Sequence, residues 1–146
     1  MASRHPITCH VLNTVTGRPV SGLRCTLSKK TDNTSGPEFI PFASADTNND
    51  GRIVFWNLGT AFNDKATSAS VKDFNDAASI GEEGYQESHD TMYCVKFDGI
   101  DELFGGDTFF PYIEIVFKIP AGKYGKEHFH IPLLLSKYSY STYRGS

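Results

Sequence analysis

The chain lacks the features that mark several large classes of protein. None of its apolar runs approaches the roughly 20 residues that a membrane span requires, and its first residues lack the apolar centre of a secretory signal. Its net charge is only −3, whereas a nucleic-acid-binding protein needs a basic face. It also contains no phosphate-binding loop, dinucleotide-binding glycine fingerprint or nucleophile elbow. We therefore expect neither a membrane protein nor a nucleic-acid-binding protein, and any enzymatic activity would use histidines as acid and base on a water, without a cofactor.

Cysteine is scarce and odd in number. The three cysteines are Cys9, Cys25 and Cys94, in a chain without a recognisable secretion signal. Reduced, mostly buried thiols in a cytosolic or similar compartment fit this pattern better than a disulfide framework. The sequence Asn33-Thr34-Ser35 matches a glycosylation acceptor, which we interpret as coincidental in a protein that is not secreted.

What the chain has in plenty is aromatic side chains and short β-type segments. Its 146 residues suit one domain that buries roughly 70% of its unfolded surface, and its eleven Phe and seven Tyr favour β structure. Segments rich in β-branched and aromatic residues alternate with turns that contain Gly, Pro, Asn or Asp. The expected strands are residues 7–15, 22–28, 38–44, 52–58, 91–97, 109–119, 127–135 and 138–144. With one or two helical turns at 99–104, the pattern predicts an all-β sandwich of eight strands and one short helix.

Residues from about 60 to 88 break this pattern, because they have low hydrophobicity and no sustained period. Residues 71–78 are compatible with a short helix. A stretch this long inside a compact domain is usually a surface insertion or a functional flap. We expect a surface insertion within a single domain that covers residues 1–146.

The polar segment from Asp46 to Gly51 matches the first half of a calcium-binding EF-hand loop. The closing bidentate Glu of such a loop would fall at position 57, which is Asn57, and the flanking residues favour strands over helices. We therefore expect a tight turn between strands, in which Asp and Asn side chains bond their own backbone.

Two histidines, His128 and His130, are expected on one face of a strand because side chains alternate with period two. His10 lies on a different predicted strand and would complete a three-histidine zinc site. The alternative is that these histidines are solvated or hydrogen-bonded and bind no metal. The residues alone leave both interpretations open.

The last predicted strand places its aromatic residues unevenly. Tyr138 and Tyr140 share one face, whereas Tyr143 shares the other with Ser139 and Ser141. A polar pocket would explain why Tyr143 stands among small hydroxyl side chains. A tyrosine on the surface is the other explanation.

The sequence resembles the transthyretin-related 5-hydroxyisourate hydrolases of urate breakdown. The terminal Tyr143-Arg144-Gly145-Ser146 is the most specific part, because the hormone-carrying transthyretins lack it and also carry other residue types in place of His10, Arg52 and His130. The stretches that carry the resemblance are 9–13, 49–52, 109–114, 128–136 and 140–146. They cover most of the chain outside the segment 60–88.

The resemblance implies a two-sheet, eight-strand sandwich and a homotetramer, a dimer of dimers, with active sites in the channel between the dimers. It also implies hydrolysis of 5-hydroxyisourate, a small purine-derived substrate, to 2-oxo-4-hydroxy-4-carboxy-5-ureidoimidazoline, with no metal and no cofactor. The alternative is a small-molecule carrier like transthyretin. Members of the family occur in cytosol and in peroxisomes, and we take the cytoplasm as the default location.

The same resemblance assigns the site residues. The catalytic set is His10, Arg52, His130 and Ser146, and the substrate-binding set is His10, Arg52 and Tyr143. One of the two histidines would serve as general base, and Arg52 would stabilise the developing oxyanion. Tyr143 would position the substrate ring, and Ser146 would hold the water or a histidine.

Overall fold

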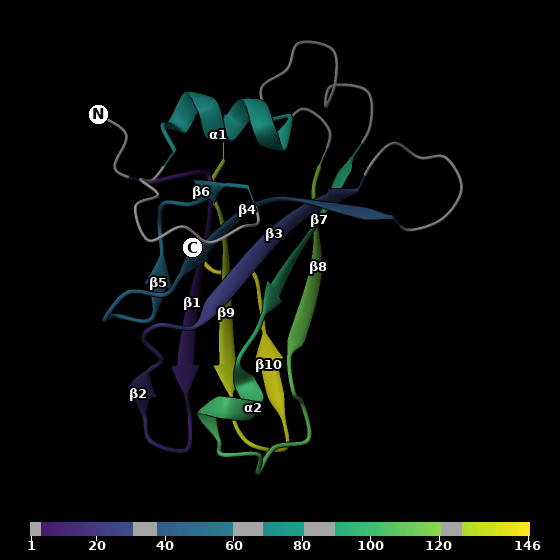
Figure 1. The fold of residues 1–146 in the computed structure, drawn as a ribbon. Coiled ribbons are helices and arrows are strands. Elements are labelled where there is room, and N and C mark those ends of the chain that lie inside the picture. The colour runs from purple at the N-terminus through teal and green to yellow at the C-terminus, as the bar shows by residue number, and fades with distance from the viewer. Residues whose placement is uncertain (1–3, 31–37, 60–68, 81–89, 121–126) are drawn as a thin grey trace.

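The computed structural model of the chain describes residues 4–30, 38–59, 69–80, 90–120 and 127–146, and every structural statement below concerns these residues. They form ten strands and two helices (Figure 1). The strands lie in two five-stranded sheets that face each other, so the expected all-β sandwich is confirmed.

The first sheet is built around its central strand, β1. Its strands are β1 (Ile7–Asn13), β2 (Arg18–Pro19), β5 (Arg52–Ile53), β9 (Phe129–Leu135) and β10 (Tyr140–Thr142). The order is β10-β9-β1-β2, and β5 also pairs with β1. Strands β1 and β9 run parallel, whereas the other pairings in this sheet are antiparallel. Segments from both ends of the chain and from its middle therefore meet on β1.

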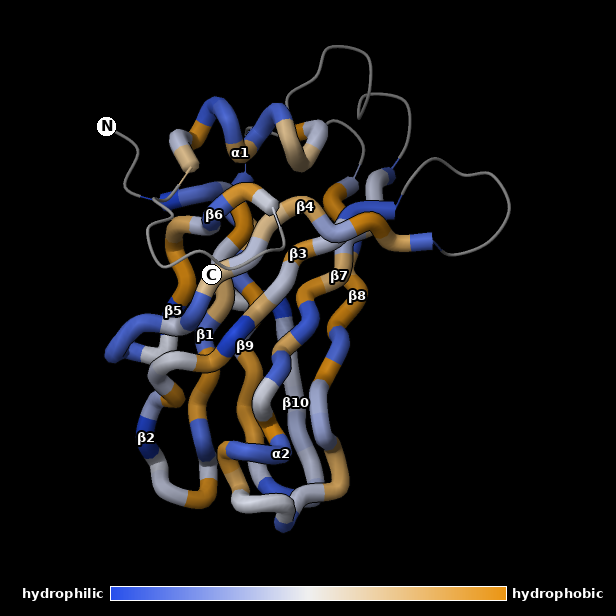
Figure 2. The backbone as a smooth tube through the Cα atoms, in the orientation of Figure 1, coloured by the Kyte–Doolittle hydropathy of each residue, from blue (hydrophilic) through white to orange (hydrophobic). Residues whose placement is uncertain are grey.

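The second sheet is antiparallel throughout, in the order β6-β4-β3-β7-β8. Its strands are β3 (Arg24–Lys30), β4 (Phe39–Asp46), β6 (Asn57–Leu58), β7 (Thr91–Phe97) and β8 (Ile113–Ile119). Hydrophobic and hydrophilic positions alternate along several strands, which is the pattern of sheets with one buried face (Figure 2).

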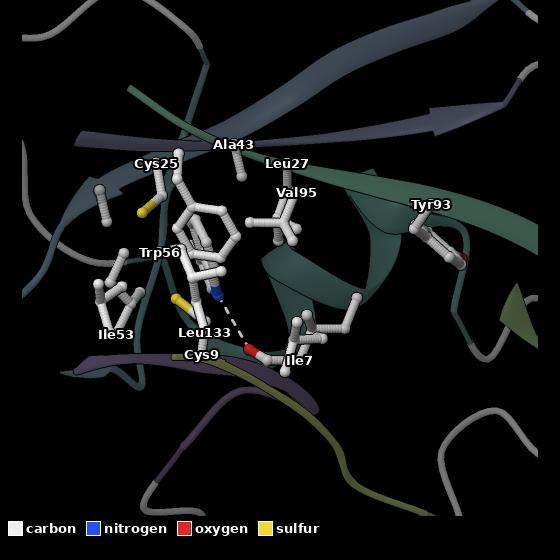
Figure 3. Packing of buried hydrophobic residues seen from close by; sticks show 14 of the residues in the cluster. Ile7, Cys9, Cys25, Leu27, Ala43, Ile53, Trp56, Tyr93, Val95 and Leu133 are labelled. Atoms are coloured by element: carbon white, nitrogen blue, oxygen red, sulfur yellow. Dashed lines mark hydrogen bonds between the residues drawn. The ribbon is translucent and has the colours of Figure 1, made fainter. Parts of the chain in front are cut away.

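The core fills the space between the two sheets (Figure 3). Alternate residues of β1, namely Ile7, Cys9 and Val11, are fully buried there, and Leu27 and Val95 of the second sheet face them. Each such aliphatic side chain contributes about 1.5–3 kcal/mol when removed from water. All three cysteines are buried and unpaired, as expected for structural thiols.

The expected single strand at residues 52–58 is wrong. The chain instead leaves the first sheet after β5 and joins the second sheet at β6. Trp56 lies at this crossing and is fully buried, and its indole N–H donates to the Ile7 carbonyl at 2.8 Å (Figure 3). Burial of this one large side chain between the sheets is the reason why the strand is interrupted.

Two further expectations differ from the structure in detail. The connection between the strands expected at 7–15 and 22–28 contains the short strand β2, where Arg18 and Pro19 pair with β1. The last strand is shorter than expected, because only residues 140–142 pair regularly with β9. The strands expected at residues 127–135 and 138–144 pair as an antiparallel hairpin that turns at Ser136–Lys137.

The described part of the chain has two helices, where one was expected. Helices α1 (Val71–Ala78) and α2 (Ile100–Leu103) lie at opposite ends of the sandwich (Figure 1). Neither is long and apolar enough to cross a membrane.

Helix α1 belongs to the segment in which a surface insertion was expected. The Ser70 side chain caps its first turn by accepting from the Asp73 N–H at 3.0 Å. Its Phe74 and Ala78 side chains are fully buried, and the Phe74 ring stacks on His5 at 4.4 Å. Residues 60–68 and 81–89 lie outside the described residues, and the helix between them packs against the core.

Candidate active site

Polar side chains gather on the outward face of the first sheet. Because Ile7 and Cys9 point into the core, their neighbours Thr8 and His10 point the other way. On β9 the same alternation buries Phe129 and turns His130 outward. The strand register sets Thr8 beside His130 and His10 beside Arg52. Residues separated by more than 100 positions in the sequence are therefore neighbours on one surface.

Arg52 is placed by the turn that precedes it. Asn48 holds this turn, because its side-chain oxygen accepts from the Asp50 N–H and the Arg52 N–H, both at 2.9 Å. Gly51 has a positive φ of 73° and lies so close to β1 that a Cβ atom there would be 2.6 Å from the Val11 carbonyl. The expected tight turn at residues 46–51 is confirmed, and it fixes the start of β5 against β1.

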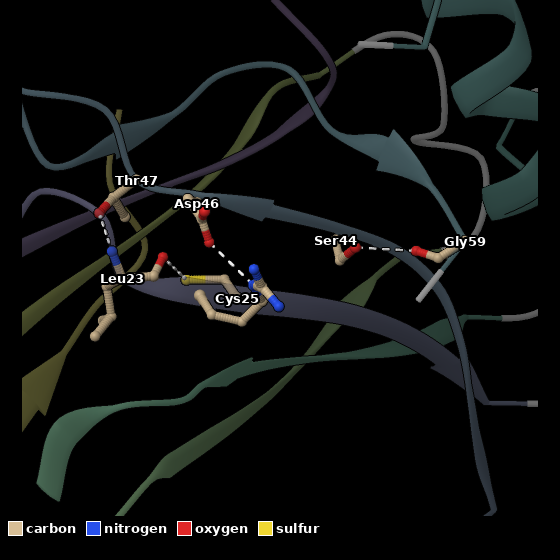
Figure 4. A network of polar contacts seen from close by, with 7 residues as sticks. Leu23, Cys25, Ser44, Asp46, Thr47 and Gly59 are labelled. Carbon is tan, nitrogen blue, oxygen red and sulfur yellow. Dashed lines mark hydrogen bonds and ion pairs between the residues drawn. The ribbon is translucent and has the colours of Figure 1, made fainter. Parts of the chain in front are cut away.

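The other end of this turn is anchored by a buried polar contact (Figure 4). The Thr47 hydroxyl accepts from the Leu23 N–H at 2.9 Å and donates to the Val20 carbonyl at 2.6 Å. Asp46 adds an ion pair with Arg24 at 3.0 Å. Both anchors reduce the freedom of the backbone that carries Arg52.

His128 and His130 share one hydroxyl partner. The Thr8 Oγ1 atom lies 2.8 Å from His128 Nε2 and 2.7 Å from His130 Nδ1. The two rings are nearly parallel, with centroids 6.0 Å apart and an interplanar angle of 22°. The expectation that both histidines occupy one face is confirmed, and Thr8 is the residue that the sequence reasoning missed. Its position two residues before His10 on the same strand was the available signal.

The surroundings hold the site histidines in their neutral form. Burial, followed by the positive charge of Arg52, lowers the pKa of His130 to about 4. Burial and then Arg52 also lower the pKa of His10, while the Asp50 backbone and carboxylate act in the opposite direction. Burial and the nearby charges of Arg4 and Arg144 lower the pKa of His128. At neutral pH each of these rings therefore carries one protonated nitrogen and one nitrogen with a lone pair.

The C-terminal segment closes against His130. The Gly145 N–H donates to the His130 carbonyl at 2.9 Å, which forms an isolated bridge beyond β10. A Cβ atom at Gly145 would lie 2.6 Å from His130 Cδ2. Arg144 reinforces the contact through an ion pair with Glu127 at 2.8 Å and lies over the Phe129 ring at 4.8 Å.

Tyr143 and Ser146 are placed by this closed segment. Tyr143 is 59% exposed and helps to line a hollow of about 330 Å³ together with His130 and Val116. Ser146 is exposed and follows Gly145 directly. The fold thus brings His10, Arg52 and His130 together on one face, while Tyr143 and Ser146 lie on the tail that packs against His130.

The histidines do not form a ready-made metal site. In the part of the chain that the structure describes, no three His, Cys, Asp or Glu side chains are grouped so that they could hold a metal ion. One nitrogen of His128 and one of His130 are occupied by the Thr8 hydroxyl.

Comparison with known proteins identifies relatives along almost the whole chain. A family model described as the HIUase/Transthyretin family matches residues 7–145. A probable 5-hydroxyisourate hydrolase from Schizosaccharomyces pombe is 33% identical and covers 100% of both chains. A 5-hydroxyisourate hydrolase from Mus musculus is also 33% identical, over 97% of this chain and 95% of that protein. The uric acid degradation bifunctional protein TTL from Arabidopsis thaliana is 36% identical over 99% of this chain, which spans only 38% of that longer protein.

Solved structures support the fold. A 5-hydroxyisourate hydrolase from Klebsiella pneumoniae superposes with a TM-score of 0.58 at 24% identity, covering 96% of this chain and 97% of that one. Transthyretin from Sparus aurata superposes with a TM-score of 0.64, also at 24% identity, covering 97% of both chains. The family match over residues 7–145 and the relatives above 30% identity show that the chain belongs to the HIUase/Transthyretin family.

Proposed function

We propose that this protein is a 5-hydroxyisourate hydrolase that acts in urate degradation. The observation that carries the proposal is the meeting of His10, Arg52 and His130 on one outward sheet face, with the C-terminal Gly145 closed against His130. Relatives named as 5-hydroxyisourate hydrolases, at 33% identity over nearly the full chain, support the choice of substrate. The product would be 2-oxo-4-hydroxy-4-carboxy-5-ureidoimidazoline.

The reaction opens a six-membered ring at an acyl C–N bond. Water must lose a proton as it attacks the carbonyl carbon, and the leaving nitrogen must gain one. His10 and His130 are the two candidates for these proton transfers, and a positioned acid or base typically contributes about 10²–10⁴-fold to a rate. Their lowered pKa values keep both rings neutral at neutral pH, so each ring has one nitrogen that donates and one that accepts.

Arg52 is suited to the charge that develops on the carbonyl oxygen. Its guanidinium is a permanent cation with several fixed donors, and its strand pairs directly with the segment that carries His10. Such a preorganised cation stabilises an oxyanion in the transition state. Tyr143 would position the substrate ring by stacking or hydrogen bonding, and Ser146 would hold the attacking water or a histidine.

The proposal includes a homotetramer, a dimer of dimers, with the sites in the channel between dimers. Large apolar side chains exposed on the single chain support it, among them Phe109 at 73% and Val116 at 55%. Light scattering tests this part, since a tetramer has the mass of four chains and a monomer would contradict it. Three buried reduced cysteines fit a reducing compartment such as the cytoplasm.

The activity itself is tested by following the ultraviolet decay of freshly generated 5-hydroxyisourate. We expect the purified protein to accelerate the decay equally with and without a chelator. Decay at the spontaneous rate, together with retained ligand binding, would instead indicate a carrier like transthyretin. Activity that disappears with the chelator would indicate a metal-dependent enzyme.

A further inference from the structure

The hydroxyl of Thr8 has a single proton but two imidazole partners. Its oxygen lies within hydrogen-bonding distance of His128 Nε2 and of His130 Nδ1, at 2.8 and 2.7 Å. It can therefore donate to one of these nitrogens only, and the other nitrogen must itself carry the proton that it shares with Thr8. The two neutral rings are thus coupled, because fixing the tautomer of one fixes the tautomer of the other.

The two directions of this hydrogen-bond chain differ at His128 Nδ1. This atom is buried and has no hydrogen-bond partner among the described residues. In the first direction, His130 Nδ1–H donates to Thr8 and Thr8 O–H donates to His128 Nε2. The remaining proton of His128 would then be on Nδ1, as a buried N–H without an acceptor, which is rare in proteins. In the opposite direction, His128 Nε2–H donates to Thr8 and Thr8 O–H donates to His130 Nδ1, so His128 Nδ1 carries only a lone pair. The nearby charges of Arg4 and Arg144 also favour a lone pair over an added proton on this ring.

We propose that Thr8 is a positioning residue that holds His130 as the tautomer protonated at Nε2. His128 Nε2–H donates to Thr8, and Thr8 O–H donates to His130 Nδ1. The second ring nitrogen of His130 then presents an N–H to the substrate and has no lone pair with which to act as base. The catalytic role inferred for this N–H rests on the proposed hydrolase function, whereas the tautomer itself is a property of the folded chain.

His10 has the complementary arrangement. Burial and then Arg52 lower the pKa of His10, whereas Asp50 acts in the opposite direction, so the ring is neutral at neutral pH. A neutral imidazole has one nitrogen with a lone pair, and no Thr8 hydroxyl donates to that nitrogen in His10, which lies on a strand position next to Arg52. The pair of histidines is therefore asymmetric, with His10 as general base and His130 as hydrogen-bond donor.

These roles account for each proton and electron pair that moves in the hydrolysis. Water oxygen forms a bond to the carbonyl carbon while His10 takes the water proton, and the carbonyl π electrons move to oxygen. The oxyanion accepts hydrogen bonds from His130 Nε2–H and from Arg52. When the C–N bond breaks, its electron pair stays on nitrogen, which takes the proton from His10 and returns that ring to the neutral state.

The tautomer is tested by NMR on the full chain with ¹⁵N-labelled histidine, assigned with His128→Gln and His130→Gln variants. The chain has only five histidines, which keeps the spectrum simple. We expect His130 to be protonated at Nε2 and unprotonated at Nδ1 in the wild type, and to be a mixture of tautomers in Thr8→Val. A wild-type His130 protonated at Nδ1 would overturn the inference. This readout needs no turnover, so it decides the role of Thr8 even if the hydrolase assay fails.

Kinetics test the consequence for catalysis. Thr8→Val keeps the shape of the side chain and removes its hydroxyl, and we expect kcat to fall by about 10- to 100-fold with little change in KM. Thr8→Ser keeps the hydroxyl and should restore most of the rate. Thr26→Val on β3 makes the same change in the second sheet and should leave the rate unaltered. Wild-type kcat in Thr8→Val, or no rescue by Ser, would contradict a positioning role for the hydroxyl.

Discussion

At the scale of single residues, Gly145 constrains the site because it has no side chain. A Cβ atom there would lie 2.6 Å from His130 Cδ2 and 3.2 Å from Pro132 Cγ. The His130 ring cannot swing aside freely, since its Nδ1 is held by Thr8 at 2.7 Å. The glycine of the terminal tetrapeptide is therefore needed for close approach of the tail to the histidine.

We predict that Gly145→Ala lowers kcat by at least about tenfold, because either the tail or His130 must move and small displacements at an active site are costly. The unfolding midpoint should change little, because Gly145 takes part only in an isolated bridge outside the regular strand pairing. Steady-state kinetics and thermal unfolding provide both measurements. Ser141→Ala in β10 is the matched control, and an alanine variant at 145 with wild-type activity would contradict the proposed close contact.

Arg52 acts on the histidines through its charge, in addition to the role proposed for it toward the substrate. Its positive charge is the second largest cause, after burial, of the low pKa of His130, which is about 4. Removing a neighbouring cation stabilises the protonated ring and so raises its pKa.

In Arg52→Met we therefore expect the pKa of His130 to rise, yet to stay below the ordinary value of 6.5 because burial remains. An NMR titration of the histidine signals measures it directly. Arg24→Met in the second sheet should leave the His130 titration unchanged. An unaltered titration in Arg52→Met would mean that the guanidinium does not face the ring.

At the scale of secondary-structure elements, the sequence predicted what depends on local pattern. Alternation of apolar residues located most strands, because one face of each sheet is buried. It did not predict the break between β5 and β6, because that break depends on where Trp56 is buried between two sheets. The alternation of side chains along a strand placed His128 and His130 on one face. The assignment of His10 and Arg52 to the site came from the resemblance to the family. Their proximity depends on strand order, which a single sequence does not reveal.

His5 connects three parts of the fold, and nothing in the sequence singled it out. Its Nε2–H donates to the Ala69 carbonyl at 2.8 Å, and its Nδ1 accepts from the Trp56 N–H at 2.9 Å. Its ring stacks on Phe74 of α1 and is fully buried. This single side chain connects the N-terminal segment, the crossing at Trp56 and the start of the helix.

We predict that His5→Leu lowers the free energy of unfolding by about 2–4 kcal/mol, since it leaves the buried Trp56 backbone N–H and the half-buried Ala69 carbonyl without partners, at about 1–3 kcal/mol each. Urea unfolding measures the change. Val15→Ala, at an exposed site, should alter stability by no more than about 0.5 kcal/mol. Wild-type stability in His5→Leu would show that these two hydrogen bonds contribute nothing net.

At the scale of the whole molecule, several buried or half-buried histidines make stability depend on pH. Burial lowers the pKa of His5, and burial with nearby cations lowers the pKa of His130 to about 4. The unfolded chain protonates the same groups near 6.5. Between these values the unfolded state binds more protons than the folded state, so the free energy of unfolding must fall as pH falls.

We therefore expect the protein to be less stable at about pH 5 than at neutral pH, with the His130 contribution complete once the pH falls below about 4. Urea unfolding across this range provides the test. His130→Gln should flatten the dependence, because it removes one of the groups responsible. Equal or greater stability at the lower pH would contradict the neutral, desolvated state of these histidines.

The central claim concerns the outward face of the first sheet, where His10, Arg52 and His130 meet. Its most direct test is the rate at which 5-hydroxyisourate decays with the wild-type protein and with folded His10→Ala and His130→Ala variants. We predict decay well above the spontaneous rate for the wild type, and a loss of about 10²-fold or more in each variant. Spontaneous decay with the wild-type protein, or full activity in both variants, would contradict the claim.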